Sequence, residues 1–169
     1  MSLKTRAVYS HSMNSCPNKF ILFLLIAFSS SCSKSDAKKL FNAGDSKYTS
    51  GDYAGAIAEF DNAIQIDPNY IKAYNNRGMA KDALKDEVGA IADYTKAIEL
   101  NPKYQFGYYN LGNAEVNLKD YTNAITDYEK AIELNPQDTA AYLNCGNLAN
   151  HPVVCNGFRA VKIDLALAV

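Results

Sequence analysis

The feature that most constrains the fold of this chain is a period of 34 residues, which recurs from residue 37 onward. Six columns of similar residues keep this step along the sequence. They are Pro68, Pro102 and Pro136; Gly44, Gly78, Gly112 and Gly146; Ala56, Ala90 and Ala124; Ala63, Ala97 and Ala131; Phe60, Tyr94 and Tyr128; and Leu40, Tyr74, Tyr108 and Tyr142. Six columns at one period indicate stacked copies of one supersecondary unit.

The second half of each unit is predicted to be an α-helix. The segments AIAEFDNAIQI, AIADYTKAIEL and AITDYEKAIEL place apolar residues at i, i+1, i+4, i+7, i+8 and i+11, which forms one stripe along a helix. Aspartate or asparagine precedes proline at 67–68, 101–102 and 135–136, and we expect its side chain to cap the following helix. Gly78 would let two helices approach closely, with Tyr74 and Tyr94 filling the space around it.

These columns resemble the tetratricopeptide repeat, in which a unit of 34 residues forms two antiparallel helices. The resemblance implies an all-α fold, a helix-turn-helix solenoid that winds into a right-handed superhelix. It covers residues 37–149, as three full units at 37–70, 71–104 and 105–138 and a partial fourth unit at 139–149. The divergent C-terminal tail, residues 150–169, is interpreted as a capping helix or, with a slight preference, as a frameshifted or truncated end, because repeat ends usually become more polar and this one does not.

The first 31 residues have the organisation of a secretory signal peptide. Lys4, Arg6 and Lys19 precede nine apolar residues at 20–28, which are too few for a membrane-spanning helix of about 20 residues. A run of small residues then leads to Cys32. This run resembles the lipobox of bacterial lipoproteins, in which the cysteine is acylated and becomes the mature N-terminus.

Carried over to this chain, the resemblance makes Cys32 the lipidated residue, residues 1–31 the signal peptide and residues 32–36 a short linker. We therefore expect an exported protein that is lipid-anchored to the bacterial cell envelope, on the periplasmic side of the outer membrane. The alternative is a soluble periplasmic or secreted protein, because Ser29 stands where lipoproteins usually have an aliphatic residue. Met1 and Met13 are both possible start sites.

Two interpretations of the cysteines beyond Cys32 stay open. Cys145 and Cys155 would lie in an exported compartment, which would allow a disulfide between them. Cys145 also falls at a core-facing position of the repeat, where it would serve as a small buried hydrophobic residue.

Charge and composition exclude several classes of function. The formal net charge is −1, so the chain does not have the excess of basic residues that is typical of nucleic-acid-binding proteins. The two histidines are His11 in the leader and His151 in the tail, and the chain has neither a CxxC motif nor a glycine-rich phosphate loop. We therefore expect no catalytic residues, no cofactor and no metal ligands. Carboxylates of the second helices, such as Asp61, Asp93 and Asp127, are interpreted as a solvated face.

The repeat instead predicts a non-catalytic module for protein–protein interaction. In such solenoids the first helix of each unit lines a concave groove, which binds an extended peptide or a partner helix. The alternative is a structural assembly subunit of an envelope complex, which would self-associate through the exposed apolar edge of the incomplete fourth unit.

One column of asparagines is not required by the fold. It lies on the first helix, on the side expected to face the groove, and resembles the asparagine ladder of the repeat domain that delivers substrates to the sugar transferase acting on serine and threonine. Each amide offers a donor and an acceptor to a peptide backbone, although the same amides could instead bond within the solenoid. The predicted groove residues are Asn42, Asn76, Asn110 and Asn144, with Phe41, Lys72, Phe106 and Tyr109 as neighbours.

Some members of the family hold the C-terminal carboxylate of chaperones with a clamp of lysine, arginine and asparagine side chains. The matching positions here are Phe41, Asp45, Asn76, Phe106 and Asn110. Only one asparagine of the clamp survives and no cation remains. We therefore expect no binding of free acidic C-termini.

Overall fold

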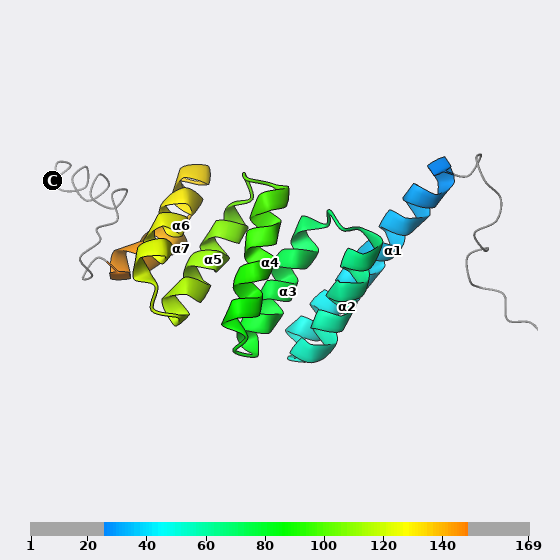
Figure 1. Cartoon of the computed structure of the whole chain (residues 1–169), viewed down its shortest axis with the longest axis horizontal. Helices are drawn as coiled ribbons and strands as arrows, with labels where there is room; N and C mark the ends of the chain where they lie inside the picture. The colour runs from blue at the N-terminus through cyan, green and yellow to red at the C-terminus, as the bar shows by residue number, and fades with distance from the viewer. Residues whose placement is uncertain (1–25, 149–169) are drawn as a thin grey trace, which may run out of the picture.

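The computed structural model describes residues 26–148, and within that range every regular element is an α-helix (Figure 1). The helices follow one another as hairpins joined by short turns. They are α1 (Ile26–Thr49), α2 (Tyr53–Ile66), α3 (Ile71–Ala83), α4 (Glu87–Leu100), α5 (Gln105–Asn117), α6 (Tyr121–Leu134) and α7 (Thr139–Asn147). The predicted all-α solenoid of helix-turn-helix units is confirmed.

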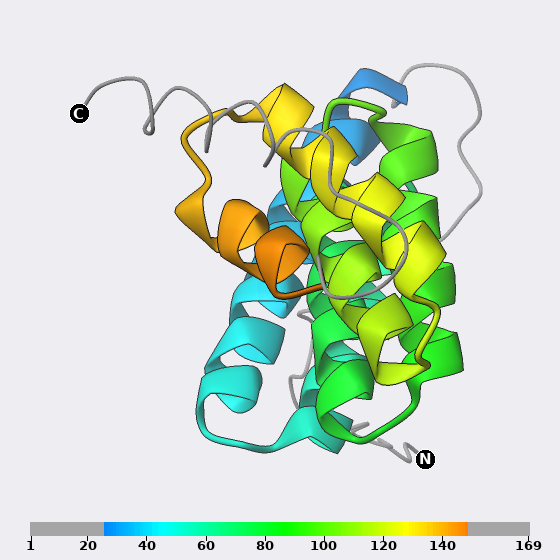
Figure 2. The same cartoon turned by 90° about the vertical axis from the view of Figure 1, so that its left-hand side faces the viewer.

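The helices stack in chain order. Each hairpin packs internally, as α1 on α2, α3 on α4 and α5 on α6, and the second helix of each hairpin packs on the first helix of the next. The view in Figure 2 shows the end of the stack, where α7 lies against α6. Because α7 is the first helix of the partial fourth unit, the described stack ends on a helix without its own partner.

Glycine and aromatic side chains make the same contact in each of the three hairpins. A Cβ added at Gly44 would lie 2.6 Å from the ring of Phe60. The corresponding distance is 2.7 Å between Gly78 and Tyr94 and 2.9 Å between Gly112 and Tyr128. The glycine column and the aromatic column therefore share a period because each ring fills the space that a side chain would occupy. Tyr74, which the sequence also placed near Gly78, has its ring centroid 5.3 Å from the Arg77 guanidinium carbon.

Aspartate side chains cap the second helix of each hairpin. Asp52, Asp86 and Asp120 each accept a hydrogen bond from a backbone N–H in the first turn, at 2.9, 3.0 and 3.3 Å. These bonds satisfy donors that the helix itself leaves without a partner.

The residues before the prolines do not cap the following helix as the sequence suggested. Asp67, Asn101 and Asn135 end the preceding helix, and each side chain accepts from the backbone N–H two residues later, at 3.0 to 3.2 Å. This Asx turn reverses the chain between units. Tyr70 and Tyr104, which directly precede α3 and α5, make no side-chain cap.

The amino-terminal helix is longer than one repeat requires. Residues 32–36, expected to be a short linker, lie inside α1, which begins at Ile26. None of the helices in the described part of the chain is long and apolar enough to cross a membrane. Most of the expected signal peptide and all of the tail, 150–169, lie outside the described residues.

Of the two cysteines Cys145 and Cys155, only Cys145 lies within the described residues. Its side chain is fully buried among residues of α6 and α7, and it is disulfide-bonded. The cysteine to which it is bonded is not among the residues whose side chains are described.

Candidate peptide-binding groove

The asparagine column links successive units of the solenoid. Its members lie on α1, α3, α5 and α7, in the order Asn42, Asn76, Asn110 and Asn144. Asn76 donates to Asp45 of the preceding unit at 3.3 Å. Asn110 likewise donates to Asn75 at 2.9 Å. These contacts correspond to the alternative that the amides bond within the solenoid.

One carboxylate sets the orientation of this hydrogen-bonded chain. Asp45 can only accept when ionised, so Asn76 must turn its amide nitrogen toward it. The oxygen of Asn76 then accepts from the amide of the buried Asn75 at 3.2 Å. The oxygen of Asn75 in turn accepts from Asn110. Each amide in the chain is therefore held in one orientation.

Asn144, the last member of the column, donates two side-chain hydrogen bonds, more than any other member. Asn144 donates to Asn113 at 2.9 Å and to the hydroxyl of Tyr109 at 3.2 Å. Asn113 also accepts from the Tyr128 hydroxyl at 2.7 Å. Asn113 therefore ties together α5, α6 and α7 at the carboxyl-terminal end of the asparagine column.

The members of the column differ in their capacity for further hydrogen bonds. A side-chain amide has two donor hydrogens and two acceptor lone pairs. Within the described residues, nothing is hydrogen-bonded to the exposed side chain of Asn42. Asn76 and Asn110 each have one donor engaged, whereas Asn144 has both engaged. Contacts inside the solenoid thus leave the first three members able to donate to a ligand and the fourth able only to accept.

The four predicted neighbours of the column differ in how much surface they offer. Phe41 is half-buried, with its ring 5.1 Å from that of Tyr70. Tyr109 is also half-buried and accepts from Asn144. Phe106 is 56% exposed and Lys72 is exposed as well. Phe106 and Lys72 are therefore the neighbours with most surface left for a ligand.

The partners of the asparagines were not predicted, although the sequence carries a signal for them. Asp45 and Asn113 each stand three residues after a column asparagine, and each accepts from the asparagine of the next unit. In the middle unit this position holds Met79, a weak acceptor. Asn110 accordingly bonds to Asn75, the residue before the column position.

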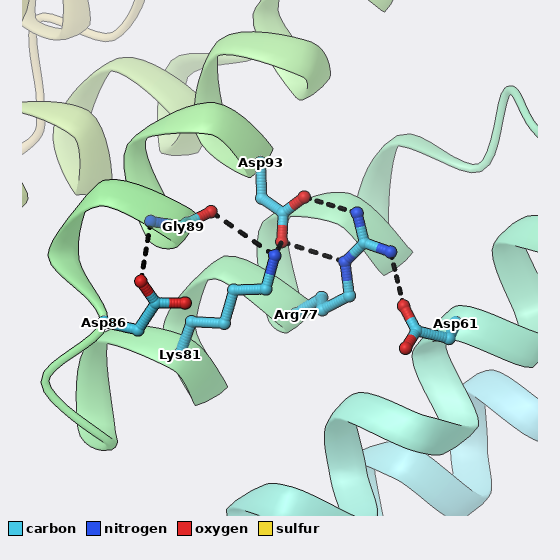
Figure 3. A network of polar contacts seen from close by, with 6 residues as sticks. All are labelled: Asp61, Arg77, Lys81, Asp86, Gly89 and Asp93. Atoms are coloured by element: carbon cyan, nitrogen blue, oxygen red, sulfur yellow. Dashed lines mark hydrogen bonds and ion pairs between the residues drawn. The ribbon is translucent and has the colours of Figure 1, made fainter.

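A charged cluster joins three helices on another face of α3 (Figure 3). Arg77 binds Asp93 of α4 through two nitrogens, with Nε 2.9 Å from Oδ2, and also binds Asp61 of α2. Lys81 lies 2.8 Å from the same Asp93. Asp93 is only 3% exposed, so the interpretation of this carboxylate as part of a solvated face was wrong.

The cluster is suited to holding helices together. Burial on its own would lower the pKa of the Arg77 guanidinium, but hydrogen bonds to Asp93 and Asp61 hold that pKa above its ordinary value. Arg77 and Lys81 together compensate the charge of the buried Asp93. Within residues 26–148, no group of three His, Cys, Asp or Glu side chains is placed to hold a metal ion.

Sequence profiles and solved structures assign the repeats. The profile described as tetratricopeptide repeat matches residues 71–104 and 106–138, and one described as TPR repeat matches residues 44–81. Together the matches span more than half of the 169 residues. No curated protein sequence matches the chain.

Three solved structures show the same fold. The first TPR of Spaghetti (RPAP3), bound to the HSP90 peptide SRMEEVD, is 28% identical with a TM-score of 0.65, covering 80% of this chain and 96% of that one. The Arabidopsis OM64 TPR domain is 25% identical with a TM-score of 0.69, covering 70% and 98%. The Sgt2 TPR domain from Aspergillus fumigatus is 25% identical with a TM-score of 0.62, covering 78% and 80%. This chain therefore belongs to the tetratricopeptide repeat family.

Proposed function

We propose that this chain is a non-catalytic interaction module that binds an extended peptide or partner helix in its groove, and that a lipid on Cys32 anchors it to the bacterial envelope. The observation that carries the first part is the asparagine column, whose first three amides keep free donors. The TPR of Spaghetti, which has the same fold, was solved with a peptide bound. At about 1 kcal/mol for each hydrogen bond, the column alone gives only weak affinity, so Phe106 and Lys72 must contribute.

Changing Asn76 and Asn110 together to alanine is expected to weaken binding of the partner about 30-fold. Two lost hydrogen bonds correspond to about 2 kcal/mol, and each 1.4 kcal/mol is a factor of about ten. The partner would first be identified by crosslinking in intact envelopes, and its affinity then measured by calorimetry. Circular dichroism would check the fold of the variant.

Two single variants separate binding from stability. Asn42→Ala removes an exposed amide that supports no contact among the described residues, so it should weaken binding about fivefold without changing the melting temperature. Asn62→Ala, exposed on α2 and outside the column, is the matched control and should change neither. Unchanged affinity in both Asn42→Ala and the folded double variant would show that the column is purely structural.

The chemistry of the groove also restricts the kind of peptide. The HSP90 peptide bound by the TPR of Spaghetti ends in the sequence EEVD. In this chain the positions of the carboxylate clamp hold Phe41, Asp45, Asn76, Phe106 and Asn110, without a cation. Amidation of a bound peptide's C-terminus should therefore leave its affinity unchanged.

Lipid anchoring has its own test. In bacterial cells, the wild-type protein should partition with membranes and incorporate labelled palmitate, and Cys32→Ser should abolish the label and release the protein from the membrane. Cys16→Ser is the matched control, because this cysteine precedes the cleavage site. Export without any label would instead support the soluble periplasmic or secreted alternative.

A structural assembly subunit is the second candidate. Leu143 on α7 is 59% exposed at the end of the stack, where a further copy or subunit could cover it. Size-exclusion chromatography of the chain from Ser33 onward discriminates the two. A stable dimer favours the assembly role, and a monomer favours a groove that is free to bind.

A further inference from the structure

A pair of charged residues recurs between the two helices of each hairpin. The two members are 12 residues apart, and the pair is repeated at the period of 34. In the first two hairpins the pair is lysine with a carboxylate, at 2.7 and 2.8 Å. The three pairs are Lys47 with Glu59, Lys81 with Asp93, and Glu115 with Asp127. The third hairpin therefore has a second carboxylate where the first two have an ammonium group.

No lysine or arginine of α4, α5 or α6 is bonded to the third pair. α5 contains neither lysine nor arginine. The lysines of α4 and α6, Lys96 and Lys130, are bonded to glutamates of their own helices. The charged groups that act on Glu115 are two acids, Asp127 and Asp120. At the position of α4 that corresponds to Asp61 of α2, the chain has the uncharged Thr95.

The position of Glu115 makes full ionisation of the pair costly. Its Oε2 is shielded from solvent and has no hydrogen-bond partner among the described residues. Two ionised carboxylates side by side repel each other, and an unsolvated one also loses its hydration. A proton held between the carboxylates removes the repulsion and supplies a hydrogen bond.

We propose that Glu115 and Asp127 share one proton and form a pH-sensitive clasp between α5 and α6, in place of the ion pairs that close the first two hairpins. The pair titrates as a unit. Burial, followed by the charge of Asp127, raises the pKa of Glu115 to about 8. Burial also raises the pKa of Asp127 above its ordinary value, against the opposing effect of its hydrogen bond with Glu115.

The clasp joins the same two helices as the hydrogen bond between Tyr128 and Asn113, and the charge of Glu115 acts on Tyr128. The hydroxyl of Tyr128 on α6 donates to Asn113 on α5, two residues before Glu115 along the chain. Asn113 in turn accepts from Asn144 of the asparagine column. Ionisation of both carboxylates would push α6 from α5 and weaken this junction, so the proton and the last column asparagine are coupled.

The expected dependence of stability on pH follows from the raised pKa of Glu115. Below about pH 4 the folded and unfolded chains both hold the proton, and the contribution to stability is fully present. As the pH rises toward 8, the unfolded chain releases the proton while the folded chain retains it, which favours unfolding. The folding equilibrium constant of the full chain should therefore fall by about 70-fold between pH 6 and pH 8.5.

Urea unfolding of the full chain across this pH range tests the clasp. Glu115→Gln, which mimics the protonated acid, should remove most of the decrease. Glu115→Lys, which recreates the pair of the first two hairpins, should remove it and raise the equilibrium constant at pH 8.5 by at least about tenfold. Glu99→Gln, an exposed glutamate on α4, is the matched control and should leave the decrease unchanged.

Carbon-13 NMR of the carboxyl groups gives a direct readout of the same proton. Glu115 should titrate near pH 8, and the side-chain amide signal of Asn144 should shift over the same range. A wild-type pH dependence that persists in Glu115→Gln, or a Glu115 that titrates near pH 4, would overturn the proposal. An Asn144 signal that does not follow the titration would overturn its coupling to the groove.

Discussion

Arg77→Ala is expected to lower the free energy of unfolding by about 3 kcal/mol. Removing one partner of a buried ion pair costs about 3–5 kcal/mol, because the other charge stays buried without compensation. The lower end of this range applies here, since the Arg77 side chain is 17% exposed and Lys81 remains bound to Asp93. Urea unfolding monitored by circular dichroism at neutral pH measures the change.

Two further variants show whether the effect comes from the buried carboxylate. Lys96→Ala removes an exposed pair with Glu99 and should cost less than about 0.5 kcal/mol. In Arg77→Ala, adding Asp93→Asn should recover part of the lost stability, because the buried site then carries no uncompensated charge. Equal losses in Arg77→Ala and Lys96→Ala would show that the cluster does not stabilise the stack.

Gly78→Ala is expected to lower the free energy of unfolding by about 2 kcal/mol, although alanine favours a helix by about 1 kcal/mol over glycine. The new Cβ would lie 2.7 Å from Cε1 and 2.9 Å from Cδ1 of Tyr94. That ring is buried and cannot move without displacing α4 from α3. Thermal unfolding of the variant gives the sign directly.

A double-mutant cycle with Tyr94→Leu tests this explanation. The smaller side chain makes room for the Cβ of residue 78, so the double variant should be more stable than the sum of the single effects predicts, by at least about 1 kcal/mol. Strict additivity would mean that the glycine is needed for a reason other than contact with the ring. A gain in stability from Gly78→Ala alone would contradict the packing argument.

The repeat period was sufficient to predict the helical hairpins and the contact of glycine with an aromatic ring. Each of these depends on which face of a helix is apolar, and the spacing of residues along the chain reports that face. Gly78 and Tyr94, for example, lie in columns that can meet only within one hairpin. The expectation of a solvated face was wrong for Asp93, because Arg77 and Lys81 of α3 bind this carboxylate and compensate its charge in the buried site. Asp61 on α2 is exposed, as expected.

The partners of the asparagine column were decided by the tertiary structure. Asn76 and Asn144 each donate to the residue that follows the column asparagine of the preceding unit by three positions. Asn110 instead donates to Asn75, the residue directly before the column asparagine of the preceding unit. The column of Lys47, Lys81 and Glu115 is visible in the sequence, but the lack of a neutralising cation near Glu115 appears only when the neighbouring helices are placed. The period determines what each helix buries, because burial depends on the geometry of one helix. The polar contacts depend on the offset between neighbouring helices, and that offset is set by how all the side chains between them pack.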